Sequence, residues 1–227
     1  MVMYYKFDLS TDTNLVGQDF PQSYKFIKEY NPNGNHAIFE LYKYRTNFPN
    51  FIPNLSGIML SGRAKLTDFI SNAFGAIIVS PKVKDTLQRF NLCPHKFYPC
   101  TLHSRGKSFD YFWLHLISDY SDYVDYKKTT FVEYNFSERR GSISVESKAE
   151  MLRKKEEIKK LYVGTNWTIW GDKIVMNSNF SSELDLFIIS RIDGNTYISE
   201  RLHNEIISNN LTGCELSPAE NITLSIF

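Results

Sequence analysis

Two stretches of the chain share one pattern, and this pattern limits the fold more than any other feature. In the first stretch, the apolar run Ala76–Val79 predicts a buried strand, and Ser80-Pro81 follows in the order of an N-cap and a first helical residue. Val83, Leu87 and Phe90 then recur at helical spacing. We therefore expect a helix over residues 81–91 that packs one apolar face on the strand.

The second copy of the pattern lies near the end of the sequence. Tyr197-Ile198-Ser199 leads into a predicted helix over residues 200–210, and Gly213 is placed to end it. With Ser199 set over Ser80, the apolar positions of the two helices coincide. The units are either related by duplication, or two capped helices after strands align by chance. Both alternatives describe scaffold and not chemistry.

The rest of the sequence predicts strands and loops around these units. From Met1 to about Pro53 the sequence alternates short apolar runs, such as Ala37–Tyr42, with turn formers. Asp110–Ile117 is dense in aromatic and branched residues, which is typical of a central strand covered on both faces. Further strands are expected at Phe97-Tyr98, Trp167–Met176 and Leu184–Ile189. We predict an α+β fold in which Ser-capped helices cover mixed sheets.

The length of 227 residues fits a single domain that can bury roughly 70% of its unfolded surface. Within it we distinguish an N-terminal part (1–60), a first unit (61–134) and a second unit (135–227). The second unit includes a predicted charged helix, which begins with capping-box spacing at Ser147–Glu150 and ends near Leu161. Leu152, Ile158 and Leu161 give that helix only a narrow apolar stripe.

The charge balance argues against several classes of partner. Lys and Arg total 26 and Asp and Glu 25, which gives a formal net charge of +1 and no field that attracts nucleic acid or an anionic membrane. The basic run in Arg153–Lys160 is interleaved with glutamates, as in a solvated, ion-paired helix. No apolar run approaches ~20 residues, and the first residues do not resemble a signal peptide. Three cysteines are too few for a disulfide framework. We expect a cytoplasmic protein.

Candidate metal ligands are concentrated in one short segment. Cys93, His95, Cys100 and His103 could supply thiolate and imidazole groups to zinc. Their spacing does not match the usual paired patterns, and the alternation of a strand would point some of them apart. The second unit offers only Cys214 in the equivalent region. We therefore expect no metal and no cofactor.

Candidate nucleophiles have simpler explanations. Ser104 and Lys107 form a Ser-x-x-Lys in a polar loop, where nothing would desolvate the lysine. Ser199 and His203 are four residues apart, but the serine is already assigned as a helix cap. The sequence contains no nucleophile elbow, phosphate loop or dinucleotide motif. We predict that the protein is not an enzyme.

An Asp-Tyr pair recurs every three residues just after the aromatic strand, over Asp119–Tyr126. Exposed tyrosines with carboxylates make good contact surface, and such a stretch could cover the basic active site of a nuclease. The alternative is a loop whose tyrosines pack back on the sheet while its aspartates face water. The candidate partner-binding residues are Asp119, Tyr120, Asp122 and Tyr123.

Several short stretches resemble a bacterial family of polymorphic-toxin immunity proteins, the group numbered eleven. The first half contributes Asp68-Phe69-Ile70, Ile77–Val83 and Phe97-Tyr98-Pro99. The second half contributes Asp185-Leu186-Phe187, Ile198–Leu202 and Leu211–Leu216, with a Leu-x-Gly turn before the closing strand. Together with the intervening residues they cover most of 60–220. The resemblance implies a cytoplasmic protein, encoded beside a secreted toxin, that binds the toxin domain tightly and needs no cofactor. The matching motifs identify no active site.

Three functional hypotheses follow. The first is an immunity protein that neutralises a cognate toxin or effector by direct occlusion. The second is a small metal-dependent or hydrolytic enzyme that uses Cys93, His95, Cys100 and His103. The third is a general interaction module of the same family without a toxin partner.

Overall fold

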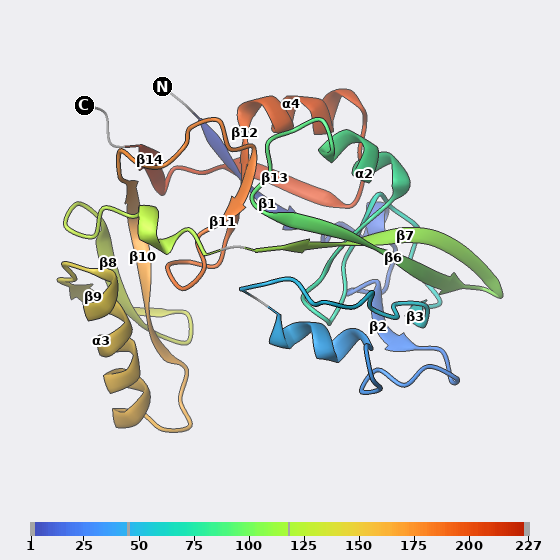
Figure 1. Cartoon of the computed structure of the whole chain (residues 1–227), viewed down its shortest axis with the longest axis horizontal. Helices are drawn as coiled ribbons and strands as arrows, with labels where there is room; N and C mark the ends of the chain where they lie inside the picture. The colour runs from blue at the N-terminus through green and yellow to red at the C-terminus, as the bar shows by residue number, and fades with distance from the viewer. Residues whose placement is uncertain (1–2, 45, 118, 225–227) are drawn as a thin grey trace.

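The computed structural model describes residues 3–44, 46–117 and 119–224 (Figure 1). Its strands are β1 (Tyr4–Leu9), β2 (Ser23–Phe26), β3 (Ile58–Leu60), β4 (Phe69–Ile70), β5 (Ile77–Val79), β6 (His95–Ser104), β7 (Lys107–Leu116), β8 (Thr130–Asn135), β9 (Glu138–Ile143), β10 (Trp167–Met176), β11 (Leu186–Ile188), β12 (Thr196–Ser199), β13 (Cys214–Pro218) and β14 (Ile222–Leu224). Its helices are α1 (Thr13–Val16), α2 (Pro81–Leu87), α3 (Lys148–Leu161) and α4 (Glu200–Ser208), with 3-10 turns η1 (Ile38–Lys43) and η2 (Ser121–Tyr123). This combination confirms the predicted α+β class. Within the described ranges, no helix has the length and apolar character needed to cross a membrane.

The strands form three sheets. One has the order β11-β12-β1-β13 and is antiparallel throughout; the others have the orders β14-β10-β8-β9 and β2-β3-β6-β7-β5-β4. The last two sheets are mixed, because β14 runs parallel to β10 and β3 runs parallel to β6. In Figure 1, β8, β9, β10 and α3 lie together on one side of the molecule, and the long β6–β7 hairpin extends to the other. We call the first group the α3 lobe.

Both predicted serine caps are present. The Ser80 hydroxyl accepts a hydrogen bond from the Val83 N–H (3.3 Å), and the Ser199 hydroxyl accepts one from the Leu202 N–H (3.1 Å). Each helix directly follows the second strand of an antiparallel pair, β4–β5 in one unit and β11–β12 in the other. The two units therefore have the same local architecture, as the alignment of their serines predicts.

The two units also hold each other through a pair of aspartates. Asp68, just before β4, accepts hydrogen bonds from the hydroxyl of its own helix cap (2.8 Å) and from the backbone N–H of Thr212, after α4 (2.9 Å). Asp185, just before β11, accepts from the hydroxyl of its own cap (2.6 Å) and from the N–H of Asn91, after α2 (2.8 Å). Each carboxylate thus joins its own helix start to the segment that leaves the other helix.

Some predicted elements differ from the structure. The two capped helices are shorter than expected and end at Leu87 and Ser208. Ala37–Tyr42, interpreted among strands and loops, lies largely in the 3-10 turn η1. Ile38 and Leu41 are its buried residues, and their spacing of three places them on one face of a 3-10 turn.

Two residue assignments are also wrong. Asn210 (φ +49°), not Gly213, provides the left-handed residue just after α4. Gly213 (φ +92°) is required further on, because a Cβ there would lie 2.1 Å from the carbonyl oxygen of Phe69. Leu161, expected on the apolar stripe of α3, is 75% exposed; the buried residues of that helix are Met151 and Ile158.

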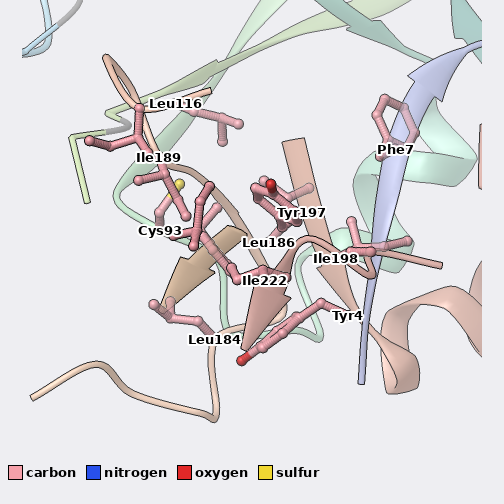
Figure 2. Close-up of a cluster of buried hydrophobic side chains, with 14 of the residues drawn as sticks. Tyr4, Phe7, Cys93, Leu116, Leu184, Leu186, Ile189, Tyr197, Ile198 and Ile222 are labelled. Atoms are coloured by element: carbon pink, nitrogen blue, oxygen red, sulfur yellow. The ribbon is translucent and has the colours of Figure 1, made fainter. Parts of the chain in front are cut away.

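The core has two parts on opposite faces of β7. Leu114 belongs to a large cluster that includes residues of all three sheets, whereas Trp113 belongs to a second cluster under η1. The prediction of a central strand covered on both faces is therefore confirmed. Figure 2 shows part of the large cluster, in which Cys93, Leu116 and Tyr197 come from different segments.

Candidate partner-binding surface

The predicted Asp-Tyr segment forms η2 and its flanks, between β7 and β8. The Asp119 carboxylate accepts hydrogen bonds from the backbone N–H (3.3 Å) and the hydroxyl of Ser121. The carbonyl of Tyr123 accepts from the Asn177 N–H (2.7 Å), and the Asp125 N–H donates to the Val175 carbonyl (2.7 Å). These bonds hold the backbone of the segment against the end of β10.

Asp119 and Asp122 both pair with the ammonium group of Lys148. Lys148, the first residue of α3, places its Nζ 2.8 Å from a carboxylate oxygen of Asp122 and 3.4 Å from one of Asp119. Burial raises the pKa of Asp119, but the Ser121 hydroxyl and the Lys148 charge outweigh burial, so that the pKa is lowered overall. The Asp122 side chain is 70% exposed, against 28% for Asp119. Asp122 is thus the carboxylate that a partner could reach.

Tyr120 and Tyr123 also differ in how exposed they are. The Tyr120 ring packs on Phe187 (6.0 Å between centroids) and on Phe180 (6.2 Å), and burial raises the pKa of its hydroxyl to about 12. Tyr123 lies on the outer side of this cluster, 5.4 Å from Tyr120, and is 37% exposed. The structure brings all four predicted residues together, but Tyr120 packs inward and Tyr123 remains accessible.

A cleft of about 870 Å³ separates the α3 lobe from η1. Its lining residues from β7 are Trp113, Leu114, His115 and Leu116; those from the η1 side include Leu41, Tyr42 and Phe74; those from the opposite side include Asp119, Trp170, Ile188 and Arg191. Asp119 therefore belongs both to the Asp-Tyr segment and to the cleft. Sequence reasoning missed this concave surface, because its residues are far apart in the chain and no single segment carries a signal.

Basic groups lie beside the cleft on the α3 lobe. Lys155 sits over the Trp170 ring (4.5 Å from Nζ to the centroid) and donates a hydrogen bond to the Arg191 carbonyl. Burial and the neighbouring Arg191 charge lower the pKa of Lys155 to about 8. The first part of the basic run is ion-paired as predicted, Arg153 with Glu157 (2.6 Å) and Lys154 with Glu150 (2.9 Å), whereas Lys159 and Lys160 make no ion pair with any described residue.

The histidine on the cleft lining has one nitrogen without a partner. His115 is buried and donates from Nε2 to the Tyr44 carbonyl (2.7 Å), whereas its Nδ1 has no hydrogen-bond partner in the part of the chain that the structure describes. Burial lowers the pKa of this imidazole, and the charge of Lys96 lowers it further against the effect of the Tyr44 bond. His115 is therefore a neutral acceptor at pH 7.

The four candidate metal ligands do not converge. Cys93 lies in the large core cluster and Cys100 in the second one, and burial raises the pKa of each thiol to about 12. His95 and His103 lie near opposite ends of β6, roughly 26 Å apart at the usual rise per residue of a strand. Across residues 3–44, 46–117 and 119–224, no group of three or more His, Cys, Asp or Glu is arranged to hold a metal ion.

The candidate nucleophiles are structural. Ser104 and Lys107 flank the tight turn of the β6–β7 hairpin. The Ser199 hydroxyl donates to Asp185 and caps α4, while the His203 ring stacks on Tyr5 (3.9 Å between centroids). Neither pair contains a hydrogen bond from nucleophile to base, the contact through which a base activates such a nucleophile.

Comparison with known proteins gives one family. No curated protein matches the sequence. The model of the immunity protein family (Imm11) matches residues 16–221, which include both strand–helix–strand units and the Asp-Tyr segment. Because this match covers nearly the whole chain, the protein belongs to the Imm11 immunity protein family.

Proposed function

We propose that the protein neutralises a cognate bacterial toxin or effector in the cytoplasm by binding to it directly. The observation that carries this proposal is the family match over residues 16–221. An immunity protein of this kind needs a preformed surface and no cofactor. The polar groups tested for catalysis serve here as helix caps, turn residues and core groups, which supports a binding role.

The contact surface includes Asp122 and Tyr123. Both side chains are accessible, and backbone hydrogen bonds hold the turn η2 that carries them, which lowers the backbone entropy lost on binding. Asp119 and Tyr120 support them from beneath, through Lys148 and the aromatic cluster respectively. A carboxylate beside a tyrosine suits a basic patch on the toxin, such as the phosphate-binding surface of a nuclease.

The proposal is tested with the carboxy-terminal domain of the protein encoded by the neighbouring gene. We expect the two proteins to co-purify as a stable complex and the present chain to restore growth of cells that express the toxin domain. Protection should require about one copy per toxin molecule, because occlusion is stoichiometric. Protection at far lower ratios would indicate turnover and contradict the proposal.

The contact residues are tested by replacing Asp122 and Tyr123 together with alanine. Since both are exposed, the fold should persist, and the affinity for the toxin measured by calorimetry should fall at least about tenfold. Asp85→Ala, at an exposed position of α2, is the matched control. If the double variant binds as tightly as this control, Asp122 and Tyr123 lie outside the interface.

A further inference from the structure

The α3 lobe ends in a cluster of exposed apolar side chains that packing within the chain does not explain. We define the apolar tip as the exposed residues Phe136, Leu161, Tyr162 and Val163, together with the partly buried Trp167 on which Tyr162 stacks. We infer that the apolar tip is a second contact surface for the toxin and that it binds an acidic face of that partner. This inference rests on the proposed function.

The exposure of the apolar tip is high for residues of this type. Val163 is 82% exposed, Leu161 75% and Phe136 68%. Isolated apolar residues on a surface are ordinary, but a contiguous apolar patch marks an interaction site. Leu161 is the last residue of α3 and Val163 lies two residues further on, so both expose their side chains where the helix could have ended in polar residues.

One ring contact and the backbone pairing beneath it bring the members of the apolar tip together. The Tyr162 ring stacks on the Trp167 ring, 4.2 Å between centroids and 9° between planes. Trp167 pairs with Asn135 in the β8–β10 ladder, and the Phe136 N–H donates to the Asn166 carbonyl (3.4 Å). The end of α3, the start of β10 and the β8–β9 turn therefore meet here. In Figure 1 this is the end of α3 from which the chain turns back into β10.

The backbone under the apolar tip is held in place. Tyr162 N–H donates to the Ile158 carbonyl (2.9 Å), and Thr165 bonds to the Tyr162 carbonyl through both its N–H (3.1 Å) and its hydroxyl (2.6 Å). Gly164 (φ +78°) makes this turn possible. A preformed aromatic and aliphatic surface loses little entropy on binding, which is a property of the residues that dominate interfaces.

The charges around the apolar tip indicate the chemistry of the partner. The Arg140 guanidinium lies 5.7 Å from the Trp167 ring and is paired with Glu138 (2.5 Å), and Arg139 is paired with Asp172 (3.4 Å). Lys159 and Lys160 are exposed and make no ion pair with any described residue. They suit the helix carboxyl end, where cations are stabilised. The exposed Glu156, one turn earlier, offsets one of the two charges, so a net positive charge remains beside the apolar tip. The complementary surface carries carboxylates around an apolar centre.

The test compares three variants of the full chain against the toxin domain by surface-based kinetics. The first replaces Leu161 and Val163 with serine; it should weaken binding at least about 100-fold, mainly through faster dissociation. The second is Lys159→Glu with Lys160→Glu, which should slow association about tenfold and remove part of its dependence on salt. The third, Ile207→Ser, changes an apolar residue of α4 that is 59% exposed and should bind as the wild type does.

Each outcome decides between the two proposals. If the wild type binds and the serine variant matches Ile207→Ser, the apolar tip is not a contact surface, while the proposed function stands. If the charge reversal speeds association, the partner face is basic and the inferred chemistry is wrong. If the wild type does not bind the toxin, the proposed function fails, and this inference fails with it. Circular dichroism of the variants confirms that each has the wild-type fold.

Discussion

At the scale of single residues, Asp185 contributes more to the fold than its small size suggests. It is 2% exposed and accepts hydrogen bonds from the Ser199 hydroxyl, the Asn91 N–H and the Arg201 guanidinium. Asp185→Ala leaves the buried donors without their acceptor, while the Arg201 side chain, which is 64% exposed, is solvated by water, so we expect a loss of about 3 kcal/mol in the free energy of unfolding. Asp68→Ala, which removes the equivalent bonds without an ion pair, should cost about 2 kcal/mol. Equal losses in urea denaturation would contradict this difference.

The pKa of Asp185 gives the same residue a pH signature. Burial raises this pKa, but the bonds from Arg201, Ser199 and Asn91 outweigh burial, so the pKa in the folded state lies below the unfolded value. The folded state then binds fewer protons, and the stabilisation is present above about pH 4 and is lost as the pH falls through the folded pKa. The stability difference between wild type and Asp185→Ala should therefore shrink in acid.

Lys155 also has a lowered pKa, but here the cause is that burial disfavours the charged form. Its pKa falls from 10.5 to about 8, so between these values the unfolded chain binds more protons and the stability of the wild type rises with pH. The charged form is unfavourable at pH 7, by at most roughly 3 kcal/mol, and its contact with Trp170 offsets part of this. We expect Lys155→Met to stabilise the protein by about 1–2 kcal/mol at pH 7. The gain should vanish near pH 10.5; a gain independent of pH would assign it to packing alone.

At the scale of elements, the close approach of β4 to the turn before β13 depends on Gly213. A Cβ at this position would meet the Phe69 carbonyl oxygen at 2.1 Å and the Thr67 side chain at 2.7 Å. Gly213→Ala should therefore destabilise the protein by about 3 kcal/mol or more, measured by urea denaturation. Gly106→Ala is the matched control, because Gly106 also has a positive φ (+76°) but nothing within 4 Å of its Cβ. The control should cost only about 1 kcal/mol.

The sequence predicted those elements whose signals are local. Ser80 and Ser199 cap their helices because a cap needs only the next three residues, and the ion pairs of α3 follow from spacing within one helix. The turn η1 was missed because its burial depends on the second core cluster, which forms only after β6 and β7 pair. The same reason explains the cleft and the exposure of Leu161. Tertiary packing decides both, and no short pattern records it.

At the scale of the whole molecule, strands near both ends of the chain pair with strands from distant parts of the sequence. β1 lies between β12 and β13, so residues from the N-terminal part complete the sheet of the second unit. β14, near the other end, pairs with β10 of the α3 lobe. The parts 1–60, 61–134 and 135–227 are therefore not separate in space. A single domain over the whole chain stays a prediction, and it can be tested by unfolding.

We expect one cooperative unfolding transition, because the large core cluster contains residues of all three sheets. The tryptophans allow this to be measured by region: Trp113 lies in β7, and Trp167 and Trp170 lie in β10. A variant with Trp167 and Trp170 changed to phenylalanine reports on the six-stranded sheet, and Trp113→Phe reports on the α3 lobe. In each variant the midpoint by fluorescence should equal the midpoint by far-ultraviolet circular dichroism. If the β10 signal is lost first in Trp113→Phe, the α3 lobe unfolds by itself, and the shared core does not couple it to the remaining sheets.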